Sequence, residues 1–135
     1  MRRALVVVSS LFALANAARA VLTIQQAIRL PDLPTAAPPP YMALMSAIWA
    51  FAFGASALGL ARSRGWAPRA TIAVILLYQA NLWLNHLAFT CSTDAAERAG
   101  FGVLLSLLSI LSVGGAALWL DRRSARRTPI DTTIE

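Results

Sequence analysis

The chain has 135 residues, of which 58% are hydrophobic and 13% are charged, and its net charge is +6. Average soluble domains are about 45–50% apolar and about 25% charged, so this composition excludes an ordinary soluble domain and indicates an integral membrane protein. All twelve Lys or Arg residues are arginines, and all but one lie near the ends of apolar runs, a distribution that argues against nucleic-acid binding. One cysteine excludes an internal disulfide, and one histidine makes a metal site unexpected.

The first apolar segment, residues 4–28, has two interpretations. The arginines Arg2 and Arg3, the aliphatic run after them and the alanines that follow fit a signal peptide cleaved after residue 17 or 20. However, the chain stays apolar and compatible with a helix until Pro31. A spanning helix requires that continuation and a signal peptide does not, so we predict an uncleaved spanning helix and keep cleavage as the alternative.

Arg19 lies inside this first segment. At 100° per residue it shares an arc of about 100° with Ser9, Asn16, Thr23 and Gln26, and such a polar stripe is expected to face protein. A central arginine costs about 2.5–3.5 kcal/mol on insertion scales. The segment holds eleven Leu, Ile, Val and Phe residues, each contributing about 0.3–0.6 kcal/mol when central, which is enough to insert it.

Three further runs contain no Asp, Glu, Arg or Lys and are long enough to cross a bilayer, which takes about 20 residues. They predict helices at 41–61, 70–90 and 101–120. We expect external loops at 31–40 and 91–100, and a tight turn at 63–69 in which Gly65 bends the chain. Short connections favour an all-α, four-helix antiparallel up-down bundle over residues 1–120. Residues 121–135 are expected to form a basic, disordered tail.

The arginines predict the orientation of this bundle. Only Arg29 and Arg98 fall at one end of the spans, and nine fall at the other: Arg2, Arg3, Arg62, Arg64, Arg69, Arg122, Arg123, Arg126 and Arg127. The positive-inside rule therefore places both termini in the cytoplasm.

Several short features together resemble small, uncharacterised four-helix membrane proteins of bacteria. They are Arg19 in the first span, Pro40-Tyr41 at the start of the second, Trp49 within it, the Trp66-Ala67-Pro68 turn and the segment from Tyr78 to Trp83. The resemblance implies a multi-pass protein of the bacterial cytoplasmic (inner) membrane and implies no activity.

A polar layer is expected in the outer half of the bundle. From 1.5 Å per residue, Arg19, Ser46, Asn85, His86 and Ser106 fall about 6 to 9 Å outward of their segment midpoints. We therefore expect Arg19 to meet Asn85, His86 or serine hydroxyls. The candidate ligand or partner site consists of Arg19, Asn16, Ser46, Asn85, His86, Ser106, Tyr78 and Trp83. Ordinary interhelical hydrogen bonds, worth about 0.6 kcal/mol each, are the alternative explanation.

Two functions fit these features. The first is a non-catalytic accessory subunit or scaffold whose small-residue stripes pair with another membrane protein or a second copy of the chain. The second is a binding protein for a lipid, a quinone or another amphipathic ligand, using the polar layer around Arg19 and His86. Membrane lipids are the expected surroundings. We expect no cofactor, no metal and no enzyme, because no acid, base and nucleophile converge at one depth.

Overall fold

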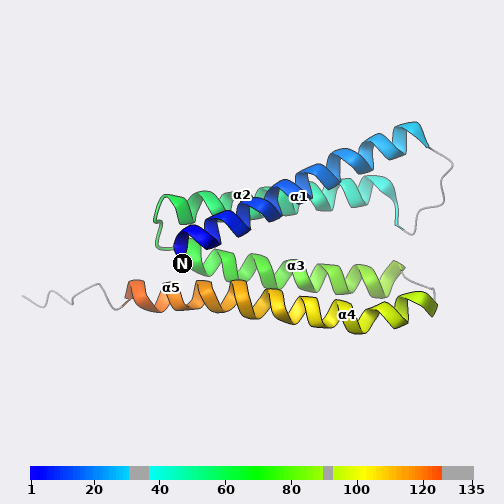
Figure 1. Ribbon diagram of the computed structural model, residues 1–135. Helices are drawn as coiled ribbons and strands as arrows, with labels where there is room; N and C mark the ends of the chain where they lie inside the picture. Colours follow the sequence, from blue (N-terminus) through cyan, green and yellow to red (C-terminus); the bar gives the residue numbers. More distant parts are fainter. Residues whose placement is uncertain (31–36, 90–92, 126–135) are drawn as a thin grey trace, which may run out of the picture.

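The computed structural model describes residues 1–30, 37–89 and 93–125, with the backbone alone described for 93–99 and 124–125. Every secondary-structure element in this part of the chain is helical. In chain order they are α1 (Arg2–Arg29), α2 (Pro39–Ala61), α3 (Ala67–Phe89), α4 (Thr93–Ser109), the π-helical turn η1 (Ile110–Gly114) and α5 (Gly115–Ala125). The last three run on as one long helix (Figure 1).

Four helices are long and apolar enough to cross a membrane, which confirms the predicted all-helical chain with four long apolar segments. Successive helices lie side by side and run in opposite directions, with the N-terminus at the same end as α5 (Figure 1). The contacts are uneven. α1 packs mainly on α2, α2 also packs on α3, and α3 packs on η1 and α5. The helices therefore form two pairs, α1 with α2 and α3 with the last helix.

Local sequence explains where the helices begin and end. Pro39 and Pro40 occupy the first turn of α2, where a proline costs no helical hydrogen bond. At the other end of α2, the N–H of Arg64 donates to Gly59 O at 2.9 Å and the N–H of Ser63 donates to Leu60 O at 3.2 Å. This is the hydrogen-bond pattern of a Schellman motif, which closes the helix and turns the chain toward α3.

The residue that takes the left-handed conformation in this motif is Ser63, with φ 57°. Gly65 lies in the next turn, which the N–H of Ala67 closes by donating to Arg64 O at 3.1 Å, so it bends the chain as expected from the sequence, but without a positive φ. Glycine is the usual residue at the left-handed position of such a motif because it has no Cβ. A serine can take that position at a modest energetic cost.

Two expected boundaries, the start and the end of the last helix, differ from the structure. The loop expected at 91–100 is helical from Thr93, because residues 95–99 are all strong helix formers. The helix expected to end at 120 continues to Ala125, and the tail beyond it lies outside the described residues. The π-helical turn was not expected. Ser112 there donates to Leu108 O at 2.6 Å, so its side chain competes for a helix carbonyl.

The core joins α1, α2, α3 and the last helix, and its buried cluster includes Leu5 of α1, Phe53 of α2, Ile75 of α3 and Ala117 of α5. Gly54 lies where α1 and α2 pack together, and a Cβ there would lie 4.0 Å from the Cβ of Ala13, which is ordinary van der Waals contact. A small residue at the crossing lets two helix backbones approach and gain packing contacts. α1 is therefore an integral part of the packed bundle.

Candidate functional site

A cavity of about 680 Å³ lies between α1, α2 and α3, toward the end where α1 finishes and α2 begins. α1 diverges from α3 toward this end of the bundle (Figure 1). Ligand sites in proteins commonly enclose about 300–1,000 Å³, so the cavity has the size of a small-molecule site. Its wall joins polar residues of α1 and α3 to aromatic and methionine side chains of α2.

The α1 wall is the polar stripe that the helical wheel predicts. Asn16, Arg19, Thr23 and Gln26 all line the cavity. Asn16 donates its side-chain N–H to Phe12 O at 2.9 Å, and Thr23 donates its hydroxyl to Arg19 O at 2.8 Å. These two side chains therefore bond within their own helix, and Arg19 is the charged group on this wall that can bind something else.

The guanidinium of Arg19 makes no hydrogen bond or ion pair with any residue that the structure describes. No Asp or Glu lines the cavity within the described part of the chain. The lining therefore has a positive charge and no negative charge to balance it. A guanidinium carries five N–H donors arranged in a fork that matches a carboxylate or a phosphate.

The α3 wall supplies neutral polar groups opposite α1. Tyr78, Asn81, Asn85 and His86 line the cavity. Asn85 accepts a hydrogen bond from the hydroxyl of Tyr41 at 2.7 Å, which joins the first turn of α2 to the last turns of α3. The amide oxygen of Asn85 is thus held in place, and the Asn85 side chain is oriented at the edge of the cavity.

Aromatic rings form the deeper end of the site. Tyr78 makes edge-to-face contacts with Phe12, Trp49 and Phe53, with ring centroids 5.9, 5.4 and 5.3 Å away. Phe12 and Phe53 are stacked at 5.0 Å. Tyr78 and Trp49 also line the cavity, so the same rings that join the three helices give the cavity an apolar, rigid end. The indole N–H of Trp49 is buried there without an acceptor in the described part of the chain.

The structure brings together five of the eight site residues expected from sequence: Asn16, Arg19, Tyr78, Asn85 and His86. The other three lie elsewhere. Ser46 is buried in α2 and does not line the cavity. The indole N–H of Trp83 donates to Ser106 Oγ at 3.2 Å, so this pair joins α3 to α4. Of the expected polar layer, Arg19, Asn85 and His86 therefore line the cavity, whereas Ser106 bonds to Trp83 and Ser46 is buried away from the cavity.

None of the α2 residues that line the cavity was among the site residues expected from the sequence. Tyr41, Met42, Met45 and Trp49 line the cavity. No pattern in the second segment distinguishes these positions, because the whole segment is apolar and its inward face depends on how the helices pack. Asn81 had a signal, since it shares a helical face with Tyr78 and Asn85.

No three His, Cys, Asp or Glu side chains gather as potential metal ligands within the described residues. No protein-family model, curated protein sequence or solved structure matches this chain. The function is therefore inferred from the geometry of the site.

Proposed function

We propose that the protein is a non-catalytic, multi-pass membrane protein that binds an acidic amphipathic molecule in the cavity between α1, α2 and α3. The ligand has a carboxylate or phosphate head that pairs with Arg19 and an apolar body that lies against the α2 and α3 side chains. In the proposed orientation the basic end faces the cytoplasm, and the cavity lies in the outer half of the bilayer.

The observation that supports this proposal is the guanidinium of Arg19 in a cavity without a carboxylate. Arg19 lies about 15 Å along α1 from Arg29, within a helix that is long and apolar enough to cross a membrane. A charge at such a depth is costly and usually marks a functional site. An anionic ligand would provide the missing counter-charge.

The composition of the wall supports an amphipathic ligand over a small inorganic anion. Near Arg19 the wall is polar, with Asn16 and Asn85, whereas Trp49 and Met45 make the α2 side apolar. A ligand that fills both parts needs a charged head and an apolar body. A neutral quinone would leave the charge of Arg19 unbalanced.

The accessory-subunit role remains the second candidate. It depends on small-residue stripes that another membrane protein could contact, and part of the stripe on α2 packs inside the molecule. Ala43 and Ala57 are buried, and Gly54 lies against Ala13. This internal use of the stripe favours the ligand-binding role.

A comparison of Arg19→Gln with Arg29→Gln tests the proposal. Both changes remove one arginine from α1, but only Arg19 lines the cavity. We expect native mass spectrometry after mild extraction to find an acidic amphiphile on the wild type and on Arg29→Gln. Its occupancy should fall about tenfold in Arg19→Gln, because a hydrogen bond to a charged group is worth about 1.5–3 kcal/mol.

Stability should change in the opposite direction. Arg19→Leu removes a costly charge from the membrane segment, so we expect the empty protein to unfold at a higher denaturant concentration while it loses the ligand. Equal occupancy in wild type and Arg19→Gln would contradict the proposal. A stoichiometric protein partner in place of a ligand would favour the accessory-subunit role.

A further inference from the structure

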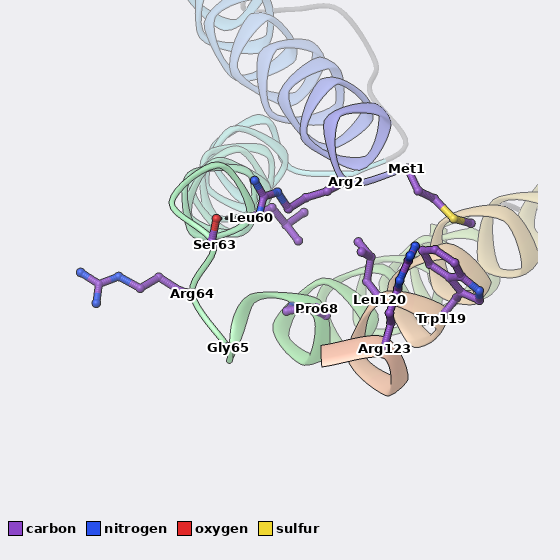
Figure 2. Close-up of a pocket in the computed structure, with 10 residues that line it drawn as sticks. All are labelled: Met1, Arg2, Leu60, Ser63, Arg64, Gly65, Pro68, Trp119, Leu120 and Arg123. Carbon is purple, nitrogen blue, oxygen red and sulfur yellow. Dashed lines mark hydrogen bonds between the residues drawn. The ribbon is translucent and has the colours of Figure 1, made fainter. Parts of the chain in front are cut away.

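The opposite end of the bundle contains a second pocket, of about 360 Å³, that the proposed function does not use. It lies where the start of α1, the turn between α2 and α3, and the end of α5 meet (Figure 2). Its lining includes Arg2, Arg64 and Arg123 and no Asp or Glu among the described residues. The pocket is therefore strongly cationic.

Two of these arginines occupy different walls of the pocket. The side chain of Arg2 extends from α1 toward Ser63 and donates a hydrogen bond to its hydroxyl, whereas Arg123 stands beside Trp119 on another wall (Figure 2). The guanidinium carbon of Arg123 lies 5.0 Å from the centroid of the Trp119 ring. Arg64 points away from the pocket (Figure 2).

The charges of these two arginines are not balanced within the described residues. Arg2 donates to a neutral hydroxyl, and Arg123 rests on an aromatic ring. The nearest acid on α5, Asp121, is paired with Arg69 through contacts of 3.1 and 3.3 Å. The guanidinium groups of Arg2 and Arg123 are thus available to bind an anion in the pocket.

The surroundings indicate where that anion comes from. Trp66 and Trp119 lie at this end with 53% and 44% of their surfaces exposed, and tryptophans commonly lie at the level of lipid head groups. Leu60, Pro68 and Leu120 give the pocket an apolar side next to the helix ends. Basic pockets between helices at this level are typical sites for phosphorylated lipid head groups.

We propose that this basic pocket binds a phosphate group through Arg2 and Arg123, with an anionic phospholipid of the adjoining leaflet as its source. The apolar side of the pocket would receive the first part of the lipid chains. A soluble phosphate could present the same chemistry, and the two sources are distinguished by experiment. This site is separate from the Arg19 cavity, so either proposal can fail without the other.

The chain offers a matched control for each arginine. Arg3 and Arg122 are the immediate neighbours of the two pocket arginines, are exposed, and do not line the pocket. R2Q/R123Q and R3Q/R122Q therefore have the same net charge at the same end of the bundle. A general attraction to anionic lipid would weaken equally in both variants, whereas a defined pocket would respond only to R2Q/R123Q.

The lipid arm of the test uses full-length protein in nanodiscs of phosphatidylglycerol and phosphatidylcholine, followed by native mass spectrometry. We expect R2Q/R123Q to retain phosphatidylglycerol about tenfold less than R3Q/R122Q, because charge-assisted hydrogen bonds are lost in one variant alone. The soluble arm measures whether inorganic phosphate raises the thermal midpoint of delipidated protein in neutral detergent. A rise in the wild type that is absent in R2Q/R123Q would support the site and assign it to soluble phosphate.

Circular dichroism checks that R2Q/R123Q keeps its helices. If R2Q/R123Q loses helix, the single variants Arg123→Gln and Arg122→Gln are compared in the lipid and phosphate measurements instead. These single changes leave the Arg2–Ser63 contact in place. Equal lipid retention by the pocket variant and its control, with no response to phosphate, would overturn the proposal.

Discussion

Gly59 is the residue whose size most tightly constrains the turn between α2 and α3. A Cβ at this position would lie 2.8 Å from an atom of the Trp66 ring and 3.0 Å from the Cβ of Ala67. Trp66 is about half exposed and can move, but Ala67 is fully buried and its Cβ is fixed to the backbone. The close contact of α2 with the start of α3 therefore requires a residue without a side chain.

We predict that Gly59→Ala destabilises the protein by about 1–3 kcal/mol, the usual cost of forcing an extra methyl group into a packed site. The measurement is an unfolding titration in mixed micelles, followed by circular dichroism. Gly115→Ala is the control, because Gly115 has helical φ and ψ and nothing within 4 Å of its Cβ position. There the higher helix propensity of alanine should stabilise by up to about 1 kcal/mol. Equal effects at both positions would refute the packing explanation.

The limits of sequence reasoning are clear at the scale of single residues. The polar stripe of α1 could be predicted, because 100° per residue fixes which side chains of one helix share a face. The partner of Trp83 could not, since depth along a helix gives no rotation about its axis. Trp83 and His86 are near neighbours on α3, yet Trp83 bonds to Ser106 whereas His86 reaches the cavity.

At the scale of elements, the Tyr41–Asn85 hydrogen bond is the polar contact that joins α2 to α3 beside the cavity. Its length is 2.7 Å, and both residues are partly buried. The contact joins residues that are 44 positions apart in the chain. It holds the open end of the bundle together where α1 diverges.

We predict that Tyr41→Phe, which removes only the hydroxyl, destabilises the protein by about 0.6–1.5 kcal/mol. A double-mutant cycle with Asn85→Ala should give a coupling energy of about the same size. Tyr78→Phe is the control, because the Tyr78 hydroxyl makes no hydrogen bond within the described residues. A coupling energy near zero would show that this hydrogen bond contributes nothing.

The existence of the elements could be predicted more reliably than their ends. Long apolar runs, three of them without charged residues, identified the four long helices, because backbone desolvation permits few alternatives to a helix in a membrane. The π-helical turn could not be predicted from the apolar pattern; in the structure Ser109 and Ser112 beside it donate to the carbonyls of Leu105 and Leu108. The start of α4 was missed because Asp94 and Glu97 suggested a solvent-exposed loop, although polar residues also form helices.

At the scale of the whole molecule, most arginines lie at one end of the bundle, and the cavity around Arg19 lies toward the other end. Arg2 meets the turn after α2, and Arg69 pairs with Asp121. Helices that are distant in sequence therefore bring their arginines to one end. If the basic end faces the cytoplasm, the two proposed sites face opposite leaflets.

Cysteine labelling tests that orientation in cells. The native Cys91 follows α3 (Ala67–Phe89) in the sequence, and Gly65 lies in the basic turn with open space around its Cβ position. Nine arginines at one end against two at the other predict that Gly65 is cytoplasmic. A membrane-impermeant maleimide should therefore label the wild type in spheroplasts. It should label Gly65→Cys, in a Cys91→Ser background, only after lysis. Denatured samples give the total label for each protein, and labelling of Gly65→Cys before lysis would invert the bundle and place the Arg19 cavity in the cytoplasmic half.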